Sequence, residues 1–391
     1  MTRSSDADPV DFSLTRNDAL MRAQRAIGLV PRTGLGVARR ALVFAAVTWL
    51  PLAVWALVQG RAVSGNVEEP LLAHFGIHVR ALLAIPLLIL AEAVSHGVTT
   101  RLMPQFLRAG LVPDSERERF LEVLRSTNRL RERAAPWVVL AGILIAVVLV
   151  APSPAANHEL VWTEQPAGGY GFAGFWFSWV LRPIFTALLL VWAWRLVLAF
   201  LLCARLARLD LRLVPTHPDG AGGLGFLEAL PIAFSPVVLA ISVVLASRWS
   251  HDVLYHGVHV DSLRMPMIAL GVVLLVLFLA PLLPWGRPLR VAKRRAELEY
   301  GALVAEHGRL VRRRWILGED VGDAPILSAP ELGPVADTIP LYEATRKMRA
   351  VPIGRRSLLA VLLPAALPQV VVLAIEIPIK DLLLGLLKTL T

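Results

Sequence analysis

The sequence predicts an all-α integral membrane protein, a polytopic helical bundle with six to seven transmembrane helices and amphipathic helices on the cytoplasmic side. Three observations predict this class. Hydrophobic residues make up 56% of the 391 residues and charged residues only 18%, against about 25% charged in an average soluble domain. Seven apolar runs approach or exceed the roughly 20 residues of a membrane-spanning helix. Lys and Arg gather in alternate segments between these runs.

Residues 1–40 are polar and contain no apolar core, so they predict a cytoplasmic N-terminal tail with a short basic amphipathic helix around Asn17–Leu29. The transmembrane bundle is predicted over residues 41–286. The fourth span is long enough to tilt or to project beyond the bilayer. The six spans are expected at Ala41–Val58, Gly76–Val98, Pro136–Val150, Gly174–Cys203, Phe226–Ala246 and Pro266–Trp285.

Two cytoplasmic segments interrupt this bundle. Residues 99–135 carry apolar side chains at helical spacing after a Pro-Asp-Ser-Glu start, which predicts an amphipathic helix. Residues 214–228 are rich in glycine and proline, which predicts a turn and not a continuous helix.

The C-terminal third begins with a cytoplasmic segment, residues 287–356. It predicts a basic helix over Leu289–Trp315 and an extended linker over Gly318–Pro340. The remaining residues, 357–391, predict either a seventh span or a re-entrant hairpin, because the run Ser357–Ile377 contains two prolines. An amphipathic tail helix in the membrane interface should follow.

The distribution of basic residues predicts the orientation. Of the 40 Lys and Arg residues, 32 fall in segments 1–40, 99–135, 204–225 and 287–357. This asymmetry predicts a cytoplasmic N-terminus and a multi-pass topology without a cleaved signal peptide.

Composition also excludes several classes. The net charge of +10 is concentrated beside apolar runs, and no nucleic-acid-binding module accompanies it, so no nucleic-acid partner is expected. Cys203 is the only cysteine, which excludes an intrachain disulfide. No phosphate-binding loop of a nucleotide-driven pump and no serine-hydrolase elbow is present.

Charged or titratable residues inside apolar runs are candidates for the lining of a substrate path, because desolvating them is costly. We expect Arg182 to pair with Glu376 and Glu92 to pair with Arg195. The alternative is that such pairs only fix helix packing, or that Arg195 reaches the headgroups. The candidate path-lining or buried polar residues are Arg182, Glu92, His96, Arg195 and Glu376.

The stretch Leu211–Glu228 is the most unusual part of the sequence. Its glycines permit backbone conformations that other residues disfavour, so its N–H groups can converge on one point. Two interpretations stay open: a tight turn capped by Asp219, or a polar element at the cytoplasmic mouth of a path. The residues concerned are His217, Asp219, Gly222, Gly223 and Glu228.

A second polar cluster is predicted in the outer loop Ser250–Asp261. Its imidazole and carboxylate groups are ligands that zinc or copper accepts, and ordinary polar-loop histidines are the alternative. The candidate ligands are His251, His256, His259 and Asp261. No other cofactor is expected.

The basic cytoplasmic helices, above all Arg312–Arg314, predict contact with anionic lipid headgroups, with a solvated helix face as the alternative. A protein partner or a homo-oligomer is also compatible with them.

Two patches carry a resemblance to a known family. One is His217-Pro218-Asp219 followed by GAGGLGFLE; the other runs from Leu341-Tyr342-Glu343 through MRAVPIG (Met348–Gly354) to the proline-containing run and the final LLLGLLKTL. In these patches the chain resembles a family of bacterial polytopic inner-membrane proteins of uncharacterised activity. The resemblance implies a bacterial inner-membrane location and a helical membrane fold, and it assigns no role to any residue.

Three functions are compatible with the sequence. The leading hypothesis is passage of a small ion or solute, as a channel or secondary transporter. The second is a membrane scaffold or accessory subunit that recruits a partner or anionic lipid. The third is an intramembrane enzyme in which His217 and Asp219 act as acid, base or metal ligand.

Overall fold

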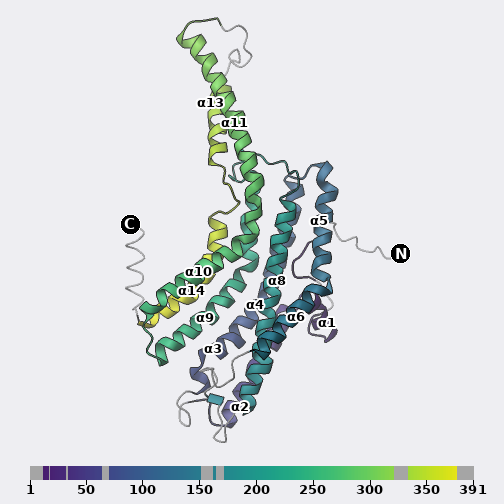
Figure 1. Cartoon of the computed structure of the whole chain (residues 1–391), viewed down its shortest axis with the longest axis vertical. Helices are drawn as coiled ribbons and strands as arrows, with labels where there is room; N and C mark the ends of the chain where they lie inside the picture. Colours follow the sequence, from purple (N-terminus) through teal and green to yellow (C-terminus); the bar gives the residue numbers. More distant parts are fainter. Residues whose placement is uncertain are drawn as a thin grey trace, which may run out of the picture.

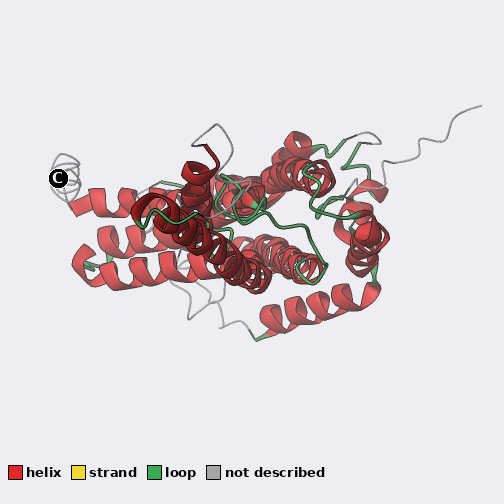
Figure 2. Ribbon diagram, turned by 90° about the horizontal axis from the view of Figure 1, so that it is seen from above, coloured by secondary structure: helices red, strands yellow, loops and turns green. Residues whose placement is uncertain are grey.

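The computed structural model of the chain describes residues 12–16, 18–31, 34–63, 70–150, 162–163, 171–320 and 333–376. These residues form helices and turns, with no β-strand among them (Figures 1 and 2). Six helices are long and apolar enough to cross a membrane, and a bent helix pair could make a seventh. The predicted fold class is therefore confirmed, and the chain is a multi-pass membrane protein.

The first part of the bundle contains a short helix and two long ones. Helix α1 (Ala19–Ala26) corresponds to the predicted amphipathic helix of the N-terminal region, and α2 (Val37–Val58) is the first span. The second span is a continuous helix of 34 residues, Phe75–Arg108. It consists of α3 (Phe75–His78), the π-helical turn η2 (Val79–Ala84) and α4 (Ile85–Arg108).

The predicted third span is the second half of a bent pair. Helix α5 (Asp114–Glu132) and helix α6 (Ala134–Leu149) meet at an angle of 41°. Both pack against α8, but no residue of α6 is buried. An apolar helix exposed on all sides is stable where lipid covers it. α6 therefore lies on the outside of the bundle.

The fourth span is the continuous helix Gly171–Leu206, which has 36 residues. It consists of α7 (Gly171–Trp176), the π-helical turn η5 (Phe177–Leu181) and α8 (Arg182–Leu206). At 1.5 Å per residue it is roughly 54 Å long, well beyond a hydrocarbon core of about 30 Å. The predicted excess length is thus present.

The fifth span begins with a 3₁₀ segment, η6 (Gly225–Phe234), and continues as α9 (Ser235–Tyr255). The sixth span continues without a break into the predicted basic helix, giving 57 helical residues over Val260–Ile316. Its parts are α10 (Val260–Leu279), η7 (Ala280–Trp285), α11 (Gly286–Val311) and η8 (Arg312–Ile316).

A helical hairpin projects from one end of the bundle. Helix α13 (Gly333–Lys347) lies beside α11 there (Figure 1), and we call this end of the molecule the hairpin end. The prediction of an extended linker up to Pro340 is therefore wrong for residues 333–340. Packing against α11 stabilises a helix that the local sequence does not favour. The ring of Tyr342 fits against Gly301, where an added Cβ would meet the ring at 3.4 Å. In addition, His307 Nδ1 lies 3.4 Å from Thr338 Oγ1.

The last described element, α14 (Arg355–Glu376), is one helix long enough to span the membrane, which favours the seventh-span prediction over a re-entrant hairpin. A proline at 364 removes the N–H that would bond the carbonyl of Ala360. The hydroxyl of Ser235, on α9, donates to that carbonyl at 2.7 Å. Polar side chains of neighbouring helices thus keep α14 intact across its prolines. The predicted interfacial tail helix lies outside the described residues.

Candidate functional site

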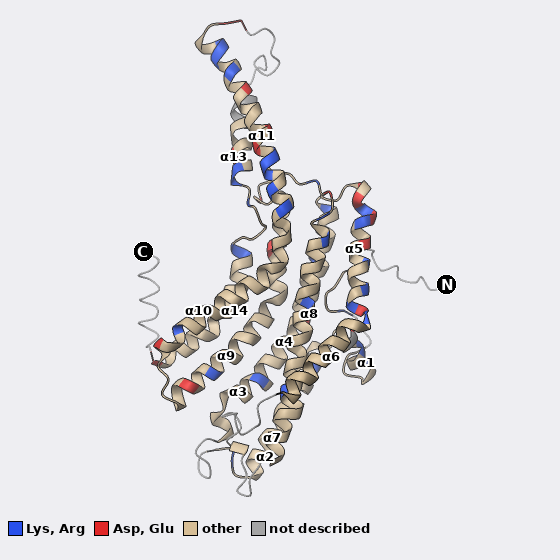
Figure 3. Cartoon of the chain, in the orientation of Figure 1, with Lys and Arg blue, Asp and Glu red and all other residues tan. Residues whose placement is uncertain are grey.

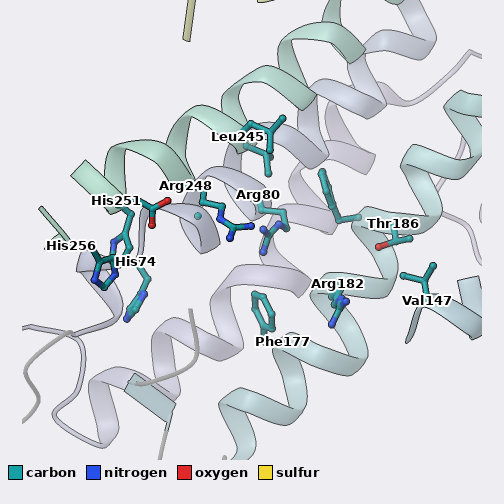
Figure 4. Close-up of a pocket in the computed structure, with 14 residues that line it drawn as sticks. His74, Arg80, Val147, Phe177, Arg182, Thr186, Leu245, Arg248, His251 and His256 are labelled. Atoms are coloured by element: carbon teal, nitrogen blue, oxygen red, sulfur yellow. The ribbon is translucent and has the colours of Figure 1, made fainter. Parts of the chain in front are cut away.

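A cavity of about 480 Å³ lies between the helices of the bundle (Figure 4), in the half that contains α3, away from the hairpin end (Figure 1). Its walls come from α3 and η2, from η5 and α8, and from α9. It is rich in basic and imidazole side chains and contains a single carboxylate. The charged and imidazole groups lining it are Arg80, Arg182, Arg248, His74, His251, His256 and Asp252. We call this space the arginine cavity.

The backbone around two of the arginines is unusual. Arg80 lies within the π-helical turn η2, and Arg182 follows directly after the π-helical turn η5. Both turns end two residues before a proline, Pro86 or Pro183. Proline lacks the N–H of a regular helical turn, so the chain widens locally. Such widened turns are frequent at functional sites.

Two of the arginines that line the cavity have no carboxylate partner among the described residues. Among the described residues, neither Arg182 nor Arg248 belongs to any ion pair, and Asp252 forms none within 4.0 Å. Arg80 lies over the rings of Phe177 and Phe185, at 5.6 and 5.7 Å from their centroids. Three arginines and one aspartate thus belong to the described lining.

The histidines form a row of contacting rings. The rings of His74 and His251 stack at 5.2 Å with 28° between their planes, and the ring of His256 meets that of His251 edge-on at 5.2 Å. His251 Nδ1 lies 3.2 Å from the carbonyl oxygen of Ala73. The row therefore belongs to the arginine cavity.

The predicted outer metal site does not assemble. His256 ends α9 whereas His259 precedes α10, so they share no helical face. His259 is 88% exposed, with Glu376 at 3.8 Å, and Asp261 pairs with Arg264 at 2.7 Å. In the part of the chain that the structure describes, no three His, Cys, Asp or Glu side chains are grouped as metal ligands.

The predicted pair of Arg182 with Glu376 is also wrong. Glu376 lies at the start of α10, where its Oε2 accepts a hydrogen bond from the backbone N–H of Val260 at 3.2 Å. A carboxylate at a helix N-terminus satisfies a free N–H group and interacts favourably with the helix dipole. Glu376 therefore has a local partner, and Arg182 faces the cavity without it.

A second charged cluster is buried in the bundle, outside the arginine cavity. Arg195 Nη2 donates to Asp18 Oδ2 at 2.6 Å and to Glu92 Oε1 at 2.9 Å, and Arg40 donates to the other oxygen of Glu92. The predicted pair Glu92–Arg195 is confirmed. All four side chains are at most 2% exposed. The two positive and two negative charges cancel, and we call this set the buried charge network.

The N-terminal region contributes to this network because it is inserted into the bundle. Phe12, Leu14 and Asp18 are each 1% exposed. Thr15 Oγ1 donates to the carbonyl of Glu92 at 3.2 Å, and His96 Nδ1 lies 2.9 Å from Ser13 Oγ. Residues 12–15 and Asp18 are therefore packed into the bundle and do not form a free tail. Glu92, His96 and Arg195 bind this segment and do not line the cavity, so Arg182 alone of the predicted path-lining residues does.

The glycine-rich turn is a self-contained structure. Asp219 accepts hydrogen bonds from the backbone N–H groups of Ala221, Gly223 and Gly225 at 2.8, 3.2 and 2.7 Å. Burial opposes ionisation of Asp219, but these bonds and the nearby His217 outweigh it, so its pKa lies below the ordinary value. The geometry is that of the tight turn with Asp219 as cap.

Two of the glycines in this turn have left-handed backbones. Gly222 has φ +65° and Gly223 φ +94°. A Cβ at either position would stand 3.0 Å from a side chain, that of Met348 or Leu111 respectively. The turn thus needs glycine for both backbone conformation and space.

The two patches quoted from the sequence contact each other through Arg349. Its Nη2 donates to the carbonyl of Asp219 at 2.7 Å, its N–H donates to the carbonyl of Gly220 at 2.8 Å, and its guanidinium pairs with Glu228 at 2.5 Å. This junction lies outside the arginine cavity. It ties the start of the fifth span to the segment that leads into α14.

Sequence reasoning missed several of these groups. Arg248 was placed in an outer segment, and Asp18 and Arg40 in a polar tail. Arg248 lies four residues before Asp252, so the two charges share one face of a helix, and this spacing is the signal that indicates Arg248. Asp18 carries the signal of a helix cap, and its carboxylate does accept from the N–H of Met21 at 2.8 Å.

Fold and cavity together define a multi-pass helical membrane protein with a basic, partly apolar cavity between its helices. Comparisons with protein-family models, with curated proteins and with solved structures find no match to this chain. The resemblance to the inner-membrane family stays a prediction. What the protein does is inferred below from the cavity itself.

Proposed function

We propose that this protein passes a small anionic solute across a bacterial inner membrane, as a channel or secondary transporter, with the arginine cavity as its binding site. The observation that carries the proposal is that Arg182 and Arg248 both line this cavity and that, among the described residues, neither belongs to an ion pair. Isolated charges at membrane depth are costly, and such residues commonly mark substrate pathways. An anion would offset that cost.

The rest of the structure is compatible with this proposal. The hairpin end carries the basic segments that we expect in the cytoplasm, so the cavity would open toward the outer side (Figure 3). Between the cavity and the hairpin end, the buried charge network and residues 12–18 fill the bundle. This arrangement corresponds to a path that is open outside and closed inside.

Flux in proteoliposomes tests the proposal. Purified protein should move at least one anion from a panel of chloride, nitrate, phosphate and short carboxylates, and Arg182→Gln should lower the rate at least tenfold. Arg264→Gln is the matched control, because Arg264 is 60% exposed and outside the cavity. Absence of flux for every anion, or equal effects of both variants, would refute the proposal.

The hairpin supports a second candidate, a scaffold that recruits a partner. Trp315 and Ile316 are 74% and 73% exposed and adjoin Arg312–Arg314. Exposed aromatic and arginine side chains are typical of interface centres. Crosslinking in cells should then recover a stoichiometric partner, and Trp315→Ala should abolish its recovery without altering anion flux. Recovery unchanged by Trp315→Ala would count against it.

A further inference from the structure

We propose that the arginine cavity binds a proton as well as an anion, and that the protein moves the two together in one direction. The proton site is the set of contacting rings of His74, His251 and His256, which we call the histidine row. This inference rests on the proposed anion transport and adds its second substrate. Three features support it: the course of the row, its hydrogen bonding and the charges around it.

The histidine row leads from the surface of the protein into the cavity. His256 is an exposed residue at the C-terminal end of α9, whereas His251 and His74 are 8% and 2% exposed. Imidazole gains and loses a proton near neutral pH, and chains of titratable side chains at membrane depth commonly serve as proton relays. The row can therefore take up a proton from water at its exposed end and hold it at its buried end.

The hydrogen bonding of His251 indicates where the proton is held. Its Nδ1 lies 3.2 Å from the carbonyl oxygen of Ala73. A carbonyl oxygen only accepts hydrogen bonds, so Nδ1 carries a hydrogen in the neutral ring as well as in the charged ring. The added proton therefore binds at Nε2, converts the imidazole to an imidazolium, and later leaves from the same atom to water. Because the ring of His74 is 5.2 Å away, charging both rings costs repulsion, and the pair holds one proton.

The charges nearest to His251 along α9 oppose this proton while the cavity is empty. Arg248 lies three residues before His251, and side chains at this spacing are neighbours on a helix. Asp252 forms no ion pair with Arg248 within 4.0 Å. Besides the rest of the row, the charged and titratable groups that line the cavity or contact the ring of His251 are, among the described residues, Arg80, Arg182, Arg248, Asp252 and Tyr255 (Figure 4).

Other titratable groups on the helices packed against α9 have partners of their own. Trp49 Nε1 donates to Nδ1 of His78 at 2.8 Å, and Glu92 belongs to the buried charge network. Glu376 accepts from the N–H of Val260. The arginines of the cavity are therefore the main charges that act on a proton at His251.

An anion reverses this effect. When an anion binds between Arg182 and Arg248, its negative charge favours a proton on His251, and the proton favours the anion to the same extent, because coupling between two bound ligands is reciprocal. Opposite unit charges about 6 Å apart in a partly buried site change a binding constant by about a hundredfold. The empty cavity and the cavity that holds both ligands are thus the favoured states, which is the condition for co-transport.

Proton movement in proteoliposomes tests the inference. Inward gradients of chloride, nitrate, phosphate and lactate are applied in turn, with valinomycin and equal potassium on both sides to hold the membrane potential at zero. A trapped pH-sensitive dye records protons, a tracer records the anion, and protein-free liposomes give the background. For the anion that the wild-type protein moves, we expect about one proton per anion, because the row holds one. Conversely, a pH difference of about one unit, acidic outside, should drive accumulation of that anion up to about tenfold.

Matched variants locate the proton site. His251→Gln removes the titrating group, so the ratio of protons to anions in the remaining flux should fall at least tenfold. The control His259→Gln should keep the wild-type ratio, because His259 is 88% exposed and does not line the cavity. Misfolding lowers both fluxes and leaves their ratio unchanged, so it cannot imitate lost coupling. If His251→Gln moves no anion at all, accumulation by the wild-type protein under the pH difference decides.

The possible failures are distinguishable. Anion flux without proton movement by the wild-type protein refutes this inference and leaves the proposed function standing. Equal ratios in His251→Gln and in the wild-type protein place the proton outside the histidine row and refute the inference as well. Absence of flux for every anion refutes the proposed function, and the inference with it.

Discussion

The buried charge network allows one prediction with a closely matched control. In Asp18→Asn the carboxylate that accepts from Arg195 at 2.6 Å becomes a neutral amide of nearly the same shape. Two buried arginines then share the single negative charge of Glu92. Breaking a buried ion pair by removing one partner costs about 3–5 kcal/mol, because the remaining charge is left uncompensated. Asparagine can still cap α1, so helix capping contributes little to the loss.

The control is Asp261→Asn. Asp261 pairs with Arg264 at 2.7 Å, nearly the same distance, but the two side chains are 75% and 60% exposed. Exposed pairs contribute about 0–1 kcal/mol. Burial is thus the main difference between the two substitutions, and the predicted losses of stability differ several-fold.

Reversible unfolding in mixed micelles, with increasing denaturing detergent, measures both free energies. We expect Asp18→Asn to lose several times more stability than Asp261→Asn. The reasoning fails if both variants lose less than about 1 kcal/mol, because Asp18 would then not compensate a buried charge. A chain lacking residues 1–16 should be destabilised as well, since Thr15 and Ser13 anchor the same segment.

Three further predictions concern the turn and the last span. Gly222→Ala should lower the stability of the fold by about 1–2 kcal/mol, because φ is +65° there. The control Gly142→Ala should not lower it, because a Cβ at Gly142 meets nothing within 4 Å; thermal unfolding measures both variants. Ser235→Ala should cost about 1–3 kcal/mol, because a partly buried carbonyl of α14 loses its donor, and an unchanged unfolding midpoint would contradict this. The lowered pKa of Asp219 means that its carboxylate stabilises the fold above the ordinary pKa, and this contribution disappears as the pH falls through the lowered value. Asp219→Asn should therefore destabilise the protein at pH 7 and make less difference near pH 3; an equal difference at both would argue against the role of the charge.

The spans were predictable because the bilayer imposes a simple rule. A helix that crosses about 30 Å of hydrocarbon needs a run of apolar residues, and such runs are visible in any sequence. The pair of Glu92 with Arg195 was predictable for a related reason. A charge inside such a run requires compensation, and few opposite charges lie at a similar depth.

The remaining groups could not be predicted because their positions depend on packing between distant segments. Nothing in the polarity of residues 12–18 indicates that Asp18 enters the bundle to meet Arg195. Helix α13 is stabilised by α11, which its own sequence does not reveal. The arginine cavity brings together arginines from three spans, at positions 80, 182 and 248, and no local periodicity encodes such a convergence.

Arg182 and Arg195 lie on one helix, about 20 Å apart along its axis, but the charges around them differ. Arg195 is neutralised twice, by Asp18 and by Glu92. Arg182 shares its surroundings with Arg80 and Arg248 and, among the described residues, with no carboxylate in ion-pair range. Like charges repel each other, so this convergence of arginines weakens the packing between their helices. A purely structural role for Arg182 does not account for such an arrangement. An anion between Arg182 and Arg248 would offset this repulsion, and this is the physical reason why we propose a ligand for the cavity.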